Sequence, residues 1–328
     1  MVIANIRRLA CLAALAALST PISADIGCAQ AYPTRNIRLI VPFAAGGPTD
    51  VIARLVAQKL GESWGHQIVV ENIPAAGGNT GVAMAARSPA DGYTVLVVST
   101  GFMVNPSMYT KIPYDPIKDF SPITLVAASP NVISVHPDFP AKTLKQLVDL
   151  VKANPGKYSF AQPATGSTPH LAGELFKQQY RLDLVTVPFN GAALAVNSTI
   201  GGHTPIAFTA LPPAMSNIKD GKLRGLAVLS SKRSPALPDV PTNGDAGVPD
   251  LESDTLTGIV APAGTPKEII ERWRNDIAKM VATPEITQRL ETLGFAPVAN
   301  TPEEFGARIK VEVARWGKVV HEANIHAD

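Results

Sequence analysis

Residues 37–51 read IRLIVPFAAGGPTDV, and this order of residue types indicates a strand, a glycine loop and a helix. Residues 37–41 form a β-branched, apolar run that is typical of a buried strand. We predict a helix over residues 49–60. The segment AAGGPTDV at 44–51 recurs as AAGGNTGV at 75–82, between a second predicted strand (67–71) and a helix that ends near Ala86. With only two copies, this is one loop chemistry used twice and not a solenoid repeat.

The alternation of short strands with amphipathic helices continues along the chain. It predicts βαβ units and a mainly parallel sheet. Further strands are expected at residues 93–99, 132–135, 158–160, 184–187, 205–208 and 223–229, and Thr143 is expected to cap a helix that ends near Ala153. Thr265 and Thr301 each precede a proline and lie three residues before a glutamate, which predicts two capping boxes.

Two series of such units predict an α/β protein with two lobes. We expect the chain to cross between the lobes near residues 125–135 and to return near 230–257, with the C-terminal helices packing back on the first lobe. Lobe 1 would then contain residues 32–130 and 257–328, and lobe 2 would contain residues 131–256. Such a double crossing would build a hinge and a ligand cleft between the lobes.

The first 31 residues are typical of a signal peptide that is removed on export. Arg7 and Arg8 precede the apolar run LACLAALAAL at 9–18, which is too short to span a bilayer. Residues 29–31 (AQA) offer a cleavage site, so the mature periplasmic chain would begin at Tyr32. An uncleaved anchor and a lipoprotein at Cys28 are the alternatives, although the acidic Asp25 disfavours the lipoprotein.

Composition excludes several function classes. The 328 residues are 46% hydrophobic and carry a net charge of +2, with the basic residues dispersed, so nucleic acid is not expected as a partner. Both cysteines, Cys11 and Cys28, lie in the signal, which excludes disulfides and thiolate sites in the mature chain. His321 and His326 are five residues apart and indicate no metal site. No Walker or G-x-G-x-x-G sequence occurs in the glycine loops, so no cofactor is predicted.

The glycine loops combine features of an anion site that needs no Lys or Arg. Glycine lets the backbone approach a ligand closely, and the start of a helix offers unpaired N–H groups with a partial positive charge. Thr49 and Thr80 add hydroxyls at two such positions. Ordinary strand-to-helix turns with threonine caps are the alternative interpretation.

Two more loops, in the second lobe, have similar chemistry. Residues 164–170 read ATGSTPH, and we expect Thr168 to be the N-cap with Pro169 as the first helical residue. Residues 189–192 (FNGA) follow the predicted strand at 184–187. We call residues 43–50, 73–81, 164–170 and 189–194 the four glycine loops; none contains Lys or Arg.

A hydrolase is the alternative that these loops raise, because Ser167 lies near His170. The sequence lacks G-x-S-x-G, and Ser167 lies where a helix cap is expected, which argues against a nucleophile. Asp50 could serve as a general base or bind an amine. An acid that is favourable in the first turn of a helix is the simpler interpretation.

The mature chain closely resembles the tripartite tricarboxylate transporter receptor family, also called Bug receptors. The resemblance runs from Tyr32 to near the C-terminus. It is carried by IRLIVPF (37–43), GGPTD (46–50), VEN (70–72), AGGNTG (76–81), DGYT (91–94), YDP (114–116), DFSP (119–122), HLAGELF (170–176), LPDVPT (237–242) and APAGTP (261–266).

The resemblance implies a type 2 periplasmic-binding-protein (Venus flytrap) fold that closes on a small carboxylate solute, and no catalysis. It also implies membrane partners, a large and a small permease subunit. The site residues that it implies are Ala45, Gly46, Gly47, Thr49, Gly78, Asn79, Thr80, Thr165, Gly166, Ser167, Thr168, His170, Phe189, Asn190, Gly191, Ala192 and Thr209. Thr209 and Leu256 depart from the family pattern, which more often has an acidic and an aromatic residue there.

An orphan receptor that presents its solute to a sensor kinase stays open as a second function. In either case we expect Thr49, Thr80 and Thr168 to reach the solute. We also expect backbone N–H groups, hydroxyls and helix dipoles to hold its carboxylate, with Gly47 and Gly78 allowing the close approach.

Overall fold

The structure is a computed structural model that describes residues 32–327. The predicted signal peptide, with its cleavage after Ala31, lies outside the described residues. Arg35–Asp328 forms one compact unit, and the fold described below is that of this unit. No helix within the described residues is long and apolar enough to cross a membrane.

Three parallel strands form the first part of the sheet. β1 (Ile37–Val41) pairs with β2 (Ile68–Asn72) on one side and with β3 (Thr94–Ser99) on the other. Because both pairings are parallel, the loops that follow β1 and β2 leave the sheet at the same edge. This topology brings the two AAGG segments to one edge of the sheet.

A second parallel group lies further along the same sheet. β5 (Ser159–Gln162) pairs with β6 (Val185–Pro188) and with β7 (Ile206–Ala210). The loops after β5 and β6 therefore also share an edge. The strand order is β2-β1-β3-β9-β4-β7-β5-β6, and both β8 (Arg224–Val228) and β10 (Ala296–Pro297) pair with β4.

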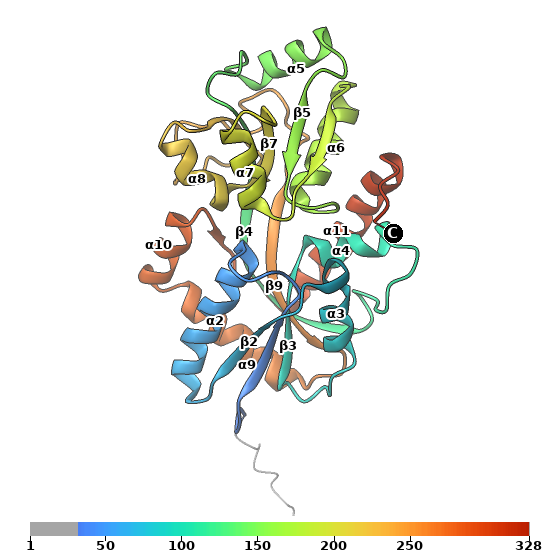
Figure 1. Ribbon diagram of the computed structural model, residues 1–328. Coiled ribbons are helices and arrows are strands. Elements are labelled where there is room, and N and C mark those ends of the chain that lie inside the picture. The colour runs from blue at the N-terminus through green and yellow to red at the C-terminus, as the bar shows by residue number, and fades with distance from the viewer. Residues whose placement is uncertain (1–31, 328) are drawn as a thin grey trace, which may run out of the picture. The chain divides into compact units, whose positions relative to one another are not determined.

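Two long antiparallel strands connect the parallel groups (Figure 1). β4 spans Phe120–Val135, and its first part pairs with β9 (Asp254–Pro262). The last five residues of β4, 131–135, pair instead with β7, and β8 pairs over 132–135. β9 also pairs with β3. The exact division between lobes at residues 130/131 and 256/257 stays a prediction.

Helices cover both parallel groups (Figure 1). Their bounds are α2 (Pro48–Trp64), the 3₁₀ turn η2 (Ala75–Gly78), α3 (Asn79–Ala86), α4 (Thr100–Met108), α5 (Leu144–Ala153), α6 (Thr168–Tyr180), α7 (Ala192–Ile200), α8 (Leu211–Lys219), α9 (Lys267–Val281), α10 (Pro284–Thr292) and α11 (Pro302–Glu322). The C-terminal helices return to the first group. Phe305 and Ile309 of α11 are buried with Leu96 and Phe102, and Trp273 of α9 packs edge-on against Trp64 at 4.9 Å.

Several sequence predictions need correction. The sheet is parallel only within the two groups, because β4 and β9 run antiparallel to their neighbours. The capping box at Thr301 is confirmed, with both reciprocal hydrogen bonds present. The one at Thr265 is wrong: its hydroxyl donates to the Pro262 carbonyl at 2.8 Å, and Pro266 is the N-cap of α9.

Candidate functional site

The first glycine loop leads from β1 into α2, and hydrogen bonds to the Asp50 carboxylate hold it in place. The Asp50 carboxylate accepts hydrogen bonds from the Gly46 N–H and the Arg54 Nε, both at 2.8 Å, and from the Asn72 Nδ2 at 2.9 Å. Gly46 has a φ of +81°, which favours glycine at this point. Gly47 is the N-cap of α2 and uses no side chain for capping. The simpler interpretation of Asp50, an acid in the first helical turn, is confirmed.

The Asp50 side chain is only 2% exposed, and its carboxylate lies 2.8 Å from the Arg54 Nε. Burial by itself raises the pKa of this carboxyl. The hydrogen bonds from Arg54, Gly46 and Asn72, with the Arg54 charge, outweigh burial and lower the pKa below its ordinary value. Asp50 is thus a structural anion that holds the loop in place.

The second glycine loop packs tightly against Pro42, the residue between β1 and the first glycine loop. Gly78 has a φ of +90°, and a Cβ there would lie 2.7 Å from the Pro42 carbonyl oxygen, so only glycine fits. The buried Asn79 begins α3, and its Oδ1 accepts from the Asn105 Nδ2 at 2.7 Å. The same Nδ2 donates to the Gly77 carbonyl at 3.2 Å. Asn105 of α4 therefore fixes the shape of this loop, and Thr80 remains exposed beside it.

The third glycine loop follows β5 and is fixed by the first turn of α6. Ser167, not Thr168, is the N-cap: its Oγ accepts from the His170 backbone N–H at 3.4 Å. The predicted cap at Thr168 is wrong by one residue. The Thr168 Oγ1 instead lies 3.3 Å from the hydroxyl of Thr255 on β9. Thr165 is exposed on the loop, so it is available to a solute.

His170 shapes this loop as a hydrogen-bond acceptor. Its Nδ1 accepts from the Gly166 N–H at 3.0 Å, and its Nε2 lies 3.7 Å from the Glu174 Oε1. Burial lowers the pKa of His170 and outweighs the nearby Glu174, while the Lys177 ammonium lowers it further. A neutral imidazole with its proton on Nε2 satisfies both contacts. Ser167 and His170 are joined through the backbone N–H of His170, and within residues 32–327 their side chains form no hydrogen bond with each other, so the pair has no nucleophile–base geometry.

The backbone of the fourth glycine loop is hydrogen-bonded to the two residues that precede the third loop. The Phe189 N–H donates to the Gln162 carbonyl at 2.9 Å, and the Gly191 N–H donates to the Pro163 carbonyl at 2.8 Å. Gly191 has a φ of +118° and leads into α7 at Ala192. Asn190 is exposed at the tip of the loop.

Two buried polar atoms lie at the carboxyl ends of the neighbouring strands β5 and β7. The Gln162 Nε2 and the Thr209 Oγ1 have no hydrogen-bond partner among residues 32–327. The residues are 1% and 0% exposed. An unpaired buried polar atom costs free energy, so each is a candidate to contact a solute or water. Gln162 was not predicted, because the predicted strand at 158–160 ends two residues before it, whereas β5 continues to Gln162.

The C-terminal end of α4 brings the second and third loops together. A Cβ on Gly166 would lie 2.0 Å from the Met108 Cε, and one on Gly77 would lie 2.4 Å from the Tyr109 hydroxyl oxygen. The two loops therefore contact adjacent residues of one segment. The helix α4 was not predicted from the sequence, because Pro106 inside it argues against a helix.

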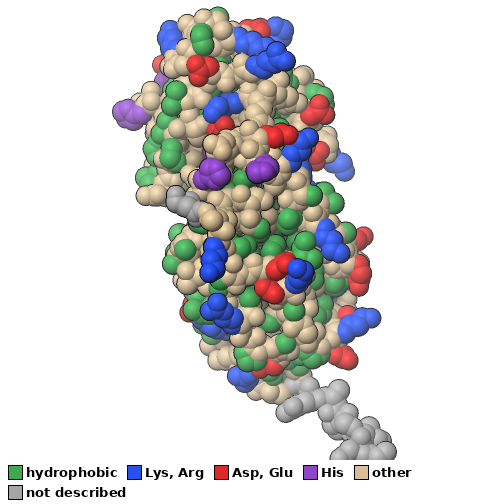
Figure 2. Space-filling model, turned by 90° about the vertical axis from the view of Figure 1, so that its right-hand side faces the viewer, with side chains coloured by type: hydrophobic (Ala, Val, Ile, Leu, Met, Phe, Trp, Pro, Cys, Tyr) green, Lys and Arg blue, Asp and Glu red, His purple; other side chains and the backbone are tan. Residues whose placement is uncertain are grey.

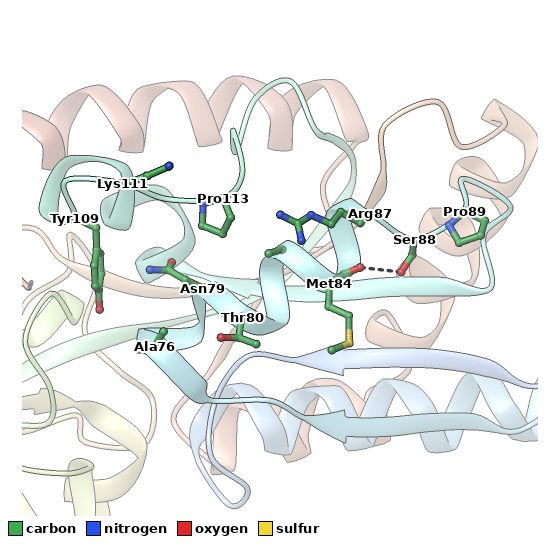
Figure 3. Close-up of a pocket in the computed structure, with 11 residues that line it drawn as sticks. Ala76, Asn79, Thr80, Met84, Arg87, Ser88, Pro89, Tyr109, Lys111 and Pro113 are labelled. Atoms are coloured by element: carbon green, nitrogen blue, oxygen red, sulfur yellow. Dashed lines mark hydrogen bonds between the residues drawn. The ribbon is translucent and has the colours of Figure 1, made fainter.

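A pocket of about 750 Å³ opens beside the second loop (Figure 3). Asn79 and Thr80 of the second loop line it together with Arg87 and Lys111. Elsewhere charged groups of both signs are interspersed, as Figure 2 shows for one face. The described residues contain no group of three or more His, Cys, Asp or Glu that could hold a metal.

Comparisons with known proteins identify the family of this chain. The family model described as "Tripartite tricarboxylate transporter family receptor" matches residues 52–325. The chain belongs to this receptor family. It is also similar to the protein BugT of Bordetella pertussis, with 36% identity over 94% of this chain and 94% of BugT.

Solved structures of related receptors share the fold. A periplasmic transporter superposes with a TM-score of 0.84 at 43% identity, covering 91% of this chain and all of that one. Rpa4515 of R. palustris, solved with adipate, has a TM-score of 0.84 at 34% identity, covering 90% and 99% of the two chains. MatC of Rhodopseudomonas palustris, solved with malate, has 0.79 at 29%, covering 88% and 100%. The tripartite tricarboxylate receptors are binding proteins, so this chain has the periplasmic-binding-protein fold and is not an enzyme.

Proposed function

We propose that this receptor captures a small carboxylate solute outside the inner membrane and delivers it to the permease subunits of a tripartite tricarboxylate transporter. The exported form would begin at Tyr32, after cleavage behind Ala31. The relatives solved with adipate and malate support a solute of this class.

The observation that carries the proposal is the set of helix starts at the glycine loops. α2, α3, α6 and α7 each begin at one of these loops. The first turn of a helix presents unpaired N–H groups, which favour an anion. The exposed hydroxyls of Thr80 and Thr165 and the unpaired Oγ1 of Thr209 supply further donors.

The absence of Lys and Arg from the four glycine loops supports a neutral mode of binding. A carboxylate that leaves water must exchange its hydration for other hydrogen bonds, because an unpaired buried ion is costly. Backbone N–H groups and hydroxyls provide them without a fixed counter-charge. Gly47 is suited to a close approach: an added Cβ there would meet only the Ala44 carbonyl oxygen, at an ordinary 3.6 Å.

A thermal-shift screen over small mono-, di- and tricarboxylates tests the function. A ligand present at about 100 times its Kd raises the free energy of unfolding by about 2.7 kcal/mol. We expect one class of carboxylates to raise the melting temperature and the matching amides to leave it unchanged. No stabilisation by any carboxylate would contradict the proposal.

Substitutions at the loops test the site. Gly47→Ala is compatible with the backbone φ of −74° and should leave stability unchanged while weakening the binding of a carboxylate found in the screen. Gly244→Ala, at an exposed glycine without a positive φ where an added Cβ would meet only the Thr242 Oγ1 at 3.7 Å, is the control for a glycine outside the loops. Equal affinities for the wild type and Gly47→Ala would remove the first loop from the site.

A further inference from the structure

The pocket beside α3 has a chemistry different from that of the glycine loops. One wall is a single face of α3, because residues 79, 80, 83, 84 and 87 follow helical spacing. The other wall is the segment after α4, with Tyr109, Lys111 and Pro113. Its volume of about 750 Å³ lies within the range of small-molecule sites.

Two cations face this pocket without an acidic partner. Arg87 and Lys111 are both exposed, and within residues 32–327 neither forms an ion pair. Figure 3 shows the two head groups extending from opposite walls toward the space around Pro113. This differs from Lys118 and Lys145, which pair with Asp115 and Asp149.

Apolar and hydrogen-bonding groups complete the lining. Met84 of α3 is 39% exposed, but its sulfur accepts a hydrogen bond from the Arg38 Nη2 at 2.9 Å, so the Tyr109 ring and Pro113 supply the apolar lining of the opposite wall. Ser88 lies at the far end, where its hydroxyl donates to the Met84 carbonyl at 2.9 Å (Figure 3). A ligand with an anionic group and a short apolar part matches this lining.

We propose that this pocket, which we call the Arg87 pocket, is a second binding site for small organic carboxylates. The carboxylate would pair with Arg87 and Lys111, and the apolar part would lie against Tyr109 and Pro113. Eight residues of α3 separate Asn79 from Arg87, about 12 Å along the helix. The carboxylate position at Arg87 is therefore distinct from the start of α3, although Asn79 and Thr80 of the second glycine loop also line the pocket.

The two sites should respond differently to salt. An exposed pair of cations attracts an anion through solvent, and dissolved ions screen that attraction. Hydrogen bonds from backbone N–H groups in a closed site are screened far less. Carboxylate binding in the Arg87 pocket should thus weaken as NaCl rises, and this would distinguish it from binding at the glycine loops.

The fluorine NMR signal of 4-fluorobenzoate provides a direct test, because its line broadens on binding to the full chain. The variant Arg87→Gln/Lys111→Gln should weaken binding about fivefold or more, as expected for the loss of two exposed ion pairs. Arg87→Lys/Lys111→Arg keeps both charges and should retain binding. Lys118→Gln/Lys145→Gln removes two exposed cations elsewhere and should bind as the wild type does.

Gly47→Ala/Thr49→Val changes the first glycine loop and separates the two proposals. Unchanged binding of the probe to this variant, with loss in Arg87→Gln/Lys111→Gln, supports the Arg87 pocket. If the probe loses binding only in Gly47→Ala/Thr49→Val, that result would support the proposed function and overturn the second site. No binding of the probe to the wild type, or equal binding by the wild type and Arg87→Gln/Lys111→Gln, would also overturn it.

Discussion

Thr209 is the residue whose buried hydroxyl most directly suggests contact with a solute. Its Oγ1 has no partner among the described residues, and the side chain is 0% exposed. Thr209→Val keeps the shape and removes the hydroxyl. We expect the free energy of unfolding to stay equal or to rise, because a buried unpaired hydroxyl costs about 1–3 kcal/mol. The affinity for the carboxylate, measured by calorimetry, should fall about tenfold or more.

Thr199 provides the matched control. It is equally buried, but its hydroxyl donates to the Ala195 carbonyl at 3.2 Å. Thr199→Val should therefore lower stability by about 1 kcal/mol and leave the affinity unchanged. If Thr209→Val instead lowers stability without affecting binding, its hydroxyl is paired inside the protein and is not part of the site.

Asp50 gives a second residue-scale prediction, on stability. Asp50→Asn loses the ionised acceptor shared by Gly46, Arg54 and Asn72 and should lower the free energy of unfolding by about 1.5–3 kcal/mol at neutral pH. The pKa of Asp50 is lowered in the fold, so its contribution is complete above the unfolded pKa of about 3.9 and is lost as the pH falls through the folded pKa.

Urea denaturation at neutral pH and near pH 3 measures this difference. The difference in the free energy of unfolding between the wild type and Asp50→Asn should be smaller near pH 3 than at neutral pH. Asp149→Asn is the control, because Asp149 is exposed and pairs only with Lys145. If this difference in the free energy of unfolding is the same at both pH values, the Asp50 charge does not stabilise the loop.

At the scale of elements, the first turn of α6 carries a pH dependence through His170. Burial lowers the His170 pKa, so the unfolded chain binds a proton more readily than the fold does. Stability should therefore fall as the pH drops below the unfolded pKa of about 6.5, and should level off below the folded pKa. His170→Gln keeps an acceptor for the Gly166 N–H and should reduce this loss.

The measurement is the free energy of unfolding between about pH 7 and pH 5, where an unperturbed histidine titrates. His321→Gln, at an exposed position near the end of α11, is the control and should follow the wild type. The same slope in His170→Gln and the wild type would mean that His170 titrates normally in the fold.

A helix or strand could be predicted from the sequence when the residues that determine it are close together in the chain. β1 was predicted with the bounds it has, because residues 37–41 are apolar and end at a proline. Thr143 was predicted as a cap, and its side chain accepts from the Gln146 N–H at 3.2 Å. Only the end of β4 was predicted, since Pro122 and Pro130 interrupt its pattern, and the pairing with β9 that maintains the strand is far away in sequence.

The same holds for the candidate site: residues that are close in the sequence could be predicted, and residues that only the fold brings together could not. The glycine loops were found because their residues are contiguous in sequence. Asn105, Met108 and Tyr109 were missed, because they shape the loops through contacts that only the fold creates. Thr168 was assigned to a cap, but its hydroxyl contacts Thr255, 87 residues away.

At the scale of the whole molecule, β4 and β9 are the elements through which a hinge would act. β4 pairs with β9 over residues 120–130 and with β7 over 131–135, so it is continuous through both parallel groups. We expect the groups to close on the solute by rigid-body motion about these strands. Small-angle scattering should show a smaller radius of gyration at saturating carboxylate. Identical curves with and without ligand would contradict hinge closure.

The central claim is that the glycine loops hold a carboxylate without a cationic side chain. A crystal structure of the chain with the tightest carboxylate from the thermal-shift screen tests it most directly. In the tight site we expect carboxylate oxygens within hydrogen-bond distance, about 2.7–3.1 Å, of backbone N–H groups and hydroxyls of the four glycine loops. A guanidinium or ammonium group paired directly with that carboxylate would contradict the claim.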